Sequence, residues 1–221
     1  MSKNTSILFL SKAKDAHCAR ALSFLRHRCG RESLTIAETK RGTPLPGGIF
    51  FLKYDYIVSY LCQHILPEHL LKCATKAAVN FHPAPPEYPG IGCVNFALYE
   101  GAATFGVTCH HMAATFDSGP IIATRRFPTF ASDDIETLLT RTYDYQLTLF
   151  YDVMTDILAG KIPKSSEQWS GKRRTRKDLD ALAAITPDLS HDEIARRIRA
   201  TSFGDWQPRL QIKGFTFELK R

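Results

Sequence analysis

Short apolar runs that alternate with helix-like segments dominate the first half of the chain. Runs of strand length stand at four places, 6–10, 34–38, 56–61 and 77–81. Apolar residues recur at helical spacing over 16–30, and Pro67-Glu68 can begin a short helix before the last run. Strand, helix and strand in this order are typical of a doubly wound α/β fold. The sequence therefore predicts a Rossmann-like, mostly parallel sheet with helices on both faces.

The second half of the chain predicts further strands and helices. Alternation of apolar and polar residues covers 103–112 and 120–127, the latter as a continuation or a hairpin partner of the former. A long helix is expected over 132–160, because acidic residues in its first turn suit the helix dipole. A last helix is expected to begin at Ser190, and Glu193 three positions later predicts a capping box.

Basic residues are concentrated in the C-terminal part of the chain. Over 161–221, 14 Lys and Arg face 8 Asp and Glu, whereas over 1–160 the counts are 15 and 14. The densest run, 172–177, is either a solvated face or a surface that attracts an anionic ligand. No aromatic residue interrupts this run, which disfavours a nucleic-acid surface. We expect a catalytic domain over 1–160 and a short basic extension over 161–221, packed on it, with a hairpin around Lys213-Gly214.

The composition points to a cytoplasmic protein without a membrane span. No apolar stretch reaches the roughly 20 residues that cross a bilayer, and the N-terminus lacks the pattern of a secretory signal. The six cysteines show no C-x-x-C spacing, so neither a zinc site nor a disulfide framework is indicated. The cluster Cys109-His110-His111 lies in a predicted strand, where neighbouring side chains point to opposite faces. We therefore expect no metal there.

Two polar residues stand at the end of the fourth apolar run, in the stretch NFHPAPPEYPG. Asn80 and His82 would lie at the carboxyl end of a central strand, where sites of α/β proteins gather. The alternative is an ordinary strand end that leads to a surface turn. The turn after the first strand reads SKAKDAHC and lacks G-x-G-x-x-G, so a dinucleotide fingerprint is absent. Asp117 stands in a later loop, AATFDSG, where it is either a turn residue or part of the same site.

Taken in order, NFHPAPPEYPGIG, FGVTCHHM and FDSGPII resemble the folate-dependent formyltransferase family over roughly residues 54–160. The family pattern is Asn-x-His, a Pro- and Gly-rich loop, a Gly-Val-Thr strand and an Asp-x-Gly loop. His82 and Asp117 lie 35 positions apart, which is similar to the family spacing. The resemblance implies transfer of a formyl group from N10-formyltetrahydrofolate to a primary amine, without a metal.

The resemblance also implies three catalytic residues. His82 would take the proton from the attacking amine, since imidazole titrates near neutral pH. The Asn80 amide would donate to the oxygen on which negative charge develops. Asp117 would orient the His82 ring or hold a water that relays the proton, and both roles stay open.

The folate site that the resemblance implies is formed largely by backbone groups on two segments. The matching residues are Gln63, His64 and Leu66 in the first segment and Ala114, Thr115 and Phe116 in the second. The alternative reading of the first segment is that Ile65 and Leu66 are core residues.

The amine substrate is expected to be a nucleotide-linked amino sugar. Methionyl-tRNA formyltransferases carry a C-terminal barrel of about a hundred residues, the size of a small domain, whereas only twenty residues follow the last predicted helix here. The glycinamide ribonucleotide enzyme carries a Gly-rich phosphate turn, which SKAKDAHC lacks. Formyltetrahydrofolate hydrolases usually carry an additional N-terminal domain. The loop NFHPAPPEYPG instead looks like that of sugar N-formyltransferases of the GDP-perosamine type, which serve surface polysaccharide such as lipopolysaccharide O-antigen.

This resemblance implies a sugar pocket beside the catalytic loop. Tyr88, Gly90 and Asn95 would border the sugar, and Arg173 and Arg174 would meet the diphosphate of a GDP- or dTDP-linked substrate. A homodimer is an open expectation. The alternative acceptors are methionyl-tRNA and glycinamide ribonucleotide, and the alternative of another class is a non-catalytic folate- or nucleotide-binding module.

Overall fold

A six-stranded sheet forms the centre of the structure, as the apolar runs predict. The computed structural model describes residues 5–204 and 206–219. The strands lie in the order β2-β1-β3-β4-β5-β6. Their bounds are Ile7–Lys12 (β1), Leu34–Thr39 (β2), Tyr54–Tyr60 (β3), Ala74–His82 (β4), Thr104–His111 (β5) and Ile121–Pro128 (β6). The first four strands pair in parallel, whereas β5 is antiparallel to β4 and β6 is antiparallel to β5, its hairpin partner.

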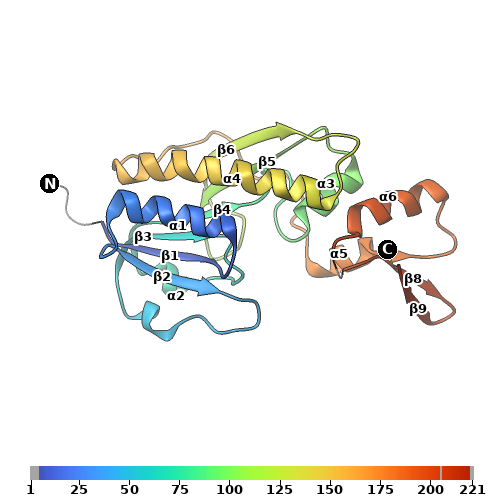
Figure 1. Ribbon diagram of the computed structural model, residues 1–221, viewed down its shortest axis with the longest axis horizontal. Coiled ribbons are helices and arrows are strands. Elements are labelled where there is room, and N and C mark those ends of the chain that lie inside the picture. The colour runs from blue at the N-terminus through green and yellow to red at the C-terminus, as the bar shows by residue number, and fades with distance from the viewer. Residues whose placement is uncertain (1–4, 205, 220–221) are drawn as a thin grey trace.

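Helices cover both faces of the sheet (Figure 1), which confirms the predicted fold class. Helices α1 (Ala16–Cys29) and α4 (Ile135–Leu158) lie on one face, and the short α2 (Glu68–Leu71) and the 3₁₀ helix η1 (Gly47–Phe50) lie on the other. In the described part of the chain, none of the helices combines the length and the apolar composition that a membrane crossing requires.

Helix α4 begins two residues later than its sequence predicts. The N-cap is Asp134, whose carboxylate accepts from the Thr137 N–H while the Thr137 hydroxyl accepts from the Asp134 N–H. This reciprocal capping box satisfies two N–H groups that a helix start leaves unpaired. Asp133 instead turns to Arg141, with two N···O distances of 2.8 Å.

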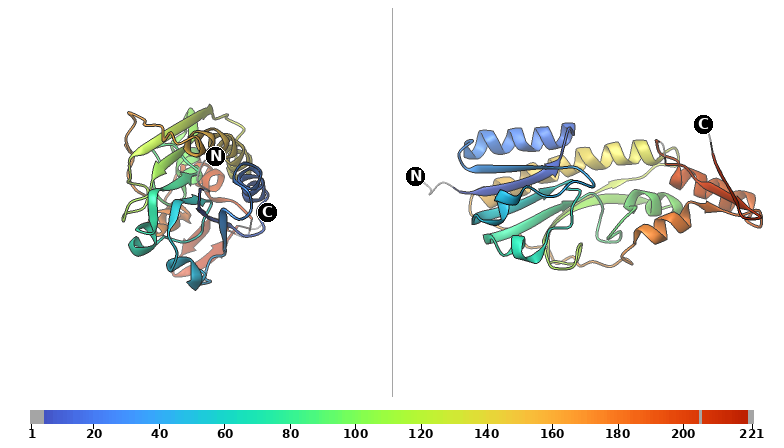
Figure 2. Two further views of the ribbon diagram at one scale, coloured as in Figure 1. Left: turned by 90° about the vertical axis from the view of Figure 1, so that its left-hand side faces the viewer. Right: turned by 90° about the horizontal axis from the view of Figure 1, so that it is seen from below.

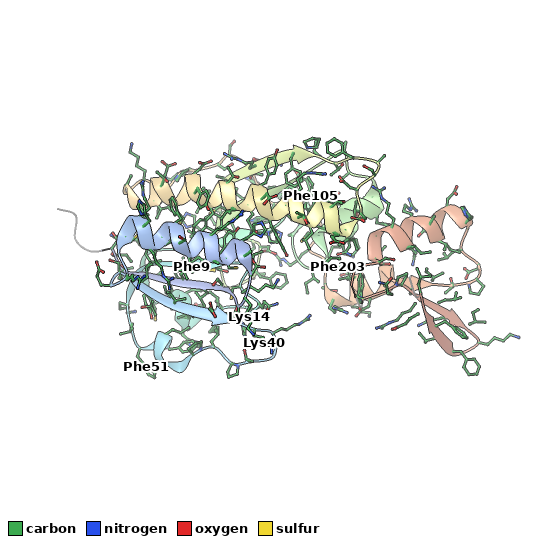
Figure 3. The ribbon with its side chains drawn as sticks, viewed as in Figure 1. Phe9, Lys14, Lys40, Phe51, Phe105 and Phe203 are labelled. Atoms are coloured by element: carbon green, nitrogen blue, oxygen red, sulfur yellow. The ribbon has the colours of Figure 1, made fainter. Side chains whose placement is uncertain are left out.

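The largest core cluster lies between the sheet and the two long helices. Phe150 of α4 packs against Phe9 of β1 at a ring-centroid distance of 6.1 Å and against Phe81 of β4 at 4.9 Å. Figure 3 shows Phe9 between the sheet and the helix layer. Each of these rings is fully buried, and burial of one such side chain contributes about 1.5–3 kcal/mol. The position of β4, and thus of Asn80 and His82, depends on this packing.

The C-terminal elements lie beyond one end of the central sheet (Figures 1 and 2). They are α5 (Arg176–Leu182), β7 (Ala184–Ile185), α6 (His191–Thr201), β8 (Arg209–Ile212) and β9 (Phe215–Glu218). Helix α6 packs on α3 (Cys93–Glu100), where the Asn95 amide donates to the Ala200 carbonyl at 2.7 Å. Strands β8 and β9 form the hairpin that the sequence predicts around Lys213-Gly214.

Two helices were not among the sequence expectations. Helix α3 is enclosed by Gly92 and Gly101, both with φ in the left-handed region that favours glycine. Helix α5 begins inside the basic run, because Thr175 and Asp178 make a capping box at its start. The capping box expected for α6 is only half formed: Ser190 Oγ accepts from the Glu193 N–H, but the Glu193 carboxylate pairs with arginines of its own helix.

Candidate active site

The antiparallel pairing of β4 and β5 brings three polar side chains together. Asn80 lies opposite His110, and His82 lies opposite Thr108. Since residues two apart in a strand share a face, Asn80, His82 and His110 belong to one face of the sheet. The Asn80 Nδ2 atom lies 3.1 Å from His110 Nε2. His110 is therefore a third member of the predicted group at the end of β4, and no catalytic role was expected for it from the sequence.

Asp117 connects this group to the Pro- and Gly-rich loop. One carboxylate oxygen lies 3.4 Å from His82 Nδ1 and 3.6 Å from His110 Nε2. The other accepts the Gly90 N–H at 2.9 Å. Asp117 has φ 48°, a left-handed conformation that Asp tolerates better than most residues. The carboxylate thus faces both histidines, and the loop is tied to it.

Neighbouring carbonyls assign the hydrogen positions on both rings. His82 Nε2 lies 3.1 Å from the Tyr88 carbonyl, which can only accept, so this nitrogen carries a hydrogen and donates. In the neutral ring, Nδ1 of His82 is then free to take a proton beside Asp117. His110 Nδ1 donates in the same way to the His111 carbonyl at 2.8 Å, so its Nε2 accepts from Asn80.

Burial and charge act in opposite directions on the central pair. Burial is the largest influence on His82 and lowers its pKa, while the Asp117 carboxylate and the Tyr88 carbonyl act to raise it. Burial alone would raise the pKa of Asp117, but His82, His110 and the Gly90 N–H stabilise the carboxylate and hold its pKa below the usual range. A neutral imidazole next to an ionised carboxylate is the state of a general base before reaction.

These side chains line a cavity of about 510 Å³, a size typical of small-molecule sites. The wall also contains Gln63, His64, Leu66, Thr115 and Phe116, five of the six predicted folate residues, whereas Ala114 is not part of it. Much of the remaining wall is apolar. The His64 Nδ1 atom is buried without a hydrogen-bond partner in the described structure. A flat heterocycle with polar edges, such as a pterin, suits such a wall.

Four of the five predicted substrate residues lie outside the cavity wall, and only Gly90 is part of it. The Tyr88 ring packs on Phe105. The Asn95 amide joins α3 to α6, as described above. Arg173 stacks on Phe116 at 5.2 Å from the ring centroid. The Arg174 guanidinium bonds to the Glu100 carboxylate at 2.9 Å.

The cavity wall includes residues that the sequence analysis missed, among them His110, Lys12 and Tyr143. The sequence does contain one signal for His110, which is its place in a strand-like segment that follows the Asn80 motif. Its position opposite Asn80 depends on the antiparallel register, which the pattern does not specify. The neighbouring Cys109 lies on the opposite face of β5. In residues 5–204 and 206–219, no three His, Cys, Asp or Glu side chains are grouped as metal ligands.

The sequence of the segment that carries this site matches a known domain family. Residues 47–154 match the model of the Formyl transferase family, and this segment contains Asn80, His82, His110 and Asp117. Residues 47–154 thus form a formyl transferase segment of the chain. The family model covers the catalytic candidates and the cavity wall apart from Lys12, but not the basic extension.

Among curated formyl transferases, methionyl-tRNA formyltransferase of Listeria monocytogenes is 30% identical over 140 residues. The aligned part is 62% of this chain and 45% of that protein, so the chain spans less than half the length of this relative.

Solved formyl transferase structures match almost the whole chain. A 4-N formyltransferase from Francisella tularensis has a TM-score of 0.77 at 18% identity, covering 99% of this chain and 100% of that one. The N-formyltransferase of Helicobacter canadensis, in complex with folinic acid and dTDP-3-aminofucose, has a TM-score of 0.75 at 17% identity, covering 95% and 85%. At these identities the likeness concerns the fold, and it includes the C-terminal elements.

Proposed function

We propose that this protein transfers a formyl group from N10-formyltetrahydrofolate to the amino group of a nucleotide-linked amino sugar. The observation that carries the proposal is the convergence of Asn80, His82 and Asp117 on one cavity whose wall suits a pterin. The family match of residues 47–154 supports the donor, as does the similar Helicobacter canadensis structure, which holds folinic acid. Within the proposed division, residues 1–160 perform the reaction and 161–221 form an extension packed on them.

The residues divide the chemistry as follows. The bound donor would supply the formyl group as electrophile. His82 Nδ1 takes a proton from the amine as the amine nitrogen bonds to the formyl carbon, and Asp117, 3.4 Å away, stabilises the imidazolium that results. The imidazolium then returns this proton to the N10 nitrogen of tetrahydrofolate, which leaves as its bond to the formyl carbon breaks. Asn80 donates one N–H to His110, which leaves its second N–H for an oxygen that gains negative charge. His110 thereby orients the Asn80 amide.

Cationic groups at one end of the sheet, one of them in the cavity wall, favour an anionic acceptor. Lys12 lines the cavity at the carboxyl end of β1. Lys14 and Lys40 project from neighbouring loops at the same end of the sheet (Figure 3), and Arg41 follows Lys40 in sequence. Such a cluster suits a diphosphate. A role for Arg173 and Arg174 in diphosphate binding stays a prediction, because Arg174 is already paired with Glu100.

Two of the similar structures support an amino-group acceptor, and one of them holds a nucleotide-linked amino sugar. The Francisella tularensis protein is a 4-N formyltransferase, and the Helicobacter canadensis protein binds dTDP-3-aminofucose. We therefore propose a 4-amino-deoxysugar of the perosamine type, linked to GDP or dTDP, as the substrate class. Methionyl-tRNA is the second candidate, because the Listeria monocytogenes relative that is 30% identical is a methionyl-tRNA formyltransferase.

Donor binding and acceptor choice test this proposal separately. Folinic acid should raise the melting temperature as its concentration rises, because a ligand that binds only the folded state stabilises it. With the formyl donor held constant, a GDP- or dTDP-linked 4-amino sugar should be formylated faster than glycinamide ribonucleotide or methionyl-tRNA. Faster turnover of methionyl-tRNA would reassign the acceptor, and absence of folinic acid binding would refute the donor.

We also propose that the protein is a homodimer joined through the hairpin β8–β9. Cross-strand pairing puts Leu210 opposite Phe217 and Ile212 opposite Phe215, so these four side chains share one face. Phe215 is 71% exposed and Phe217 is 55% exposed. Exposed apolar groups of this extent mark interaction surfaces. No charge lies among the four residues, so two copies can meet there despite the net charge of +7.

The variant Phe215→Asp should convert the dimer to a monomer, because a two-fold contact would bury the new carboxylate twice. Light scattering after size-exclusion chromatography measures the change. Thr216→Asp, on the opposite face of the same strand, is the matched control and should stay dimeric. A monomeric wild-type protein, or a Phe215→Asp variant that remains dimeric, would refute this assembly.

A further inference from the structure

A short segment of the extension lies against the catalytic loop, and we call residues 165–174 the strap. Three backbone bonds join it to the Pro-rich part of the loop, one of them from the Gly171 N–H to the Pro86 carbonyl at 3.4 Å. The Ser170 N–H donates to the Pro86 carbonyl at 3.2 Å, and the Arg174 N–H donates to the Pro89 carbonyl at 3.0 Å. The strap is therefore hydrogen-bonded to the loop at both Pro86 and Pro89.

The approach of the two segments requires a glycine in the strap. A Cβ atom at Gly171 would lie 1.6 Å from the Glu87 carbonyl oxygen. Since that oxygen belongs to the backbone, it has no rotamer that would relieve the clash. The strap is thus packed at a distance that only glycine permits, and residues beside Gly171 have a defined position relative to the loop.

Trp169 is the strap residue that reaches the histidines. Its ring lies edge-on to His82 at a centroid distance of 5.7 Å and to His110 at 5.0 Å, with interplanar angles of 71° and 86°. Its Nε1–H donates to the Gly119 carbonyl at 2.8 Å, in the loop that carries Asp117. One side chain therefore contacts both rings and is tied to the Asp117 loop. Trp169 is not part of the cavity wall, so it acts on the histidines from outside the cavity.

We propose that Trp169 is a positioning residue that holds the His82 and His110 rings in place and keeps water from them. This proposal rests on the proposed function for its catalytic consequence. Edge-to-face packing restricts the tilt of both rings, and His110 in turn orients Asn80. The basic extension thereby takes part in the reaction through an aromatic contact rather than through its charge.

Loss of the indole should hydrate His82 and move its titration. The titratable and charged groups that face His82 are Asp117, His110 and Cys93, with Arg173 next to the Asp117 carbonyl. Burial is the largest influence and lowers the pKa of His82, so partial hydration would return it toward its ordinary value of 6.5. The acidic limb of the rate profile should then shift to higher pH, because more of the base is protonated at a given pH.

Fluorescence tests the placement of Trp169 without a catalytic assay. The chain contains two tryptophans, so Trp206→Phe leaves Trp169 as the only one. Protonated imidazole quenches indole emission on contact, and the emission of this variant should therefore fall as the pH is lowered through the titration of His82. Adding His82→Gln should remove much of this change, and His110→Gln should alter the emission at neutral pH, because it replaces a ring that packs on the indole. His69→Gln is the control, since His69 packs on Phe50 and should leave the curve unaltered.

Kinetics test the consequence. Trp169→Ala should lower kcat about tenfold or more, with a much smaller change in KM, because a misplacement of ~1 Å can cost on the order of 10²-fold. Trp169→Phe, which keeps an aromatic ring against both histidines, should recover most of the loss. Circular dichroism and the melting temperature establish that both variants are folded.

The outcomes separate this proposal from the proposed function. Emission of the Trp206→Phe variant that does not respond to either histidine would overturn the placement of Trp169. A folded Trp169→Ala variant with wild-type kcat and an unshifted pH profile would overturn its positioning role. If no acceptor is formylated by the wild type, the proposed function fails, while the fluorescence titration still decides whether Trp169 reports on the histidines.

Discussion

Replacing His82 by glutamine should lower kcat by about 10²- to 10⁴-fold, the usual contribution of a positioned general base. Glutamine approximates the size of the ring and can still donate to the Tyr88 carbonyl, but it cannot take a proton from the amine. Asn80→Ala should lower kcat by on the order of 10²-fold, because it removes the donor to the developing oxyanion. Single-turnover formylation of the amino sugar, with folinic acid binding measured in parallel, gives both values.

Two observations distinguish catalysis from structure in this experiment. His69→Gln, a histidine on α2 outside the cavity, should keep the wild-type rate. The wild-type rate should fall on acidification with a midpoint below 6.5, because burial disfavours the charged form of His82. His82→Gln should lack this acidic limb. Near wild-type turnover by His82→Gln would show that another group takes the proton.

Asp117→Asn should lower kcat by about 10²-fold or more while it leaves folinic acid binding within a few-fold of wild type. Asparagine is nearly isosteric and tolerates the left-handed backbone that Asp117 adopts at φ 48°, so the loop should persist. Its amide oxygen can still accept the Gly90 N–H. What is lost is the negative charge that stabilises the His82 imidazolium.

The pH profile checks this explanation. Since the Asp117 carboxylate raises the pKa of His82, its removal should move the acidic limb further down, opposite in direction to the shift expected for Trp169→Ala. Ser118→Ala is the neighbouring control, because Ser118 is exposed and its hydroxyl donates to the Thr115 carbonyl of its own turn. An acidic limb at the wild-type pH in Asp117→Asn would show that the pKa of His82 does not depend on the Asp117 charge.

The local elements followed from sequence patterns because their causes are local. The apolar run at 6–10 predicted β1, and α1 ended at Gly30, whose φ of 80° favours glycine. Ser190 capped α6, and Lys213-Gly214 turned the last hairpin. The start of α5 was not predicted. The residues 172–177 were interpreted by their charge alone, although Thr175 and Asp178 form the capping box of this helix.

The sequence by itself determined that Asn80 and His82 share a strand face, since residues two apart in a strand always do. It also put Asp117 in a loop at a spacing that matches the formyl transferases. Only the tertiary structure decided which groups meet them. The antiparallel register of β4 and β5 set His110 against Asn80, and the strap brought Trp169 to both histidines across a long separation in sequence. Strand periodicity is a property of neighbouring residues, whereas register and the path of a connecting segment depend on the packing of the whole core.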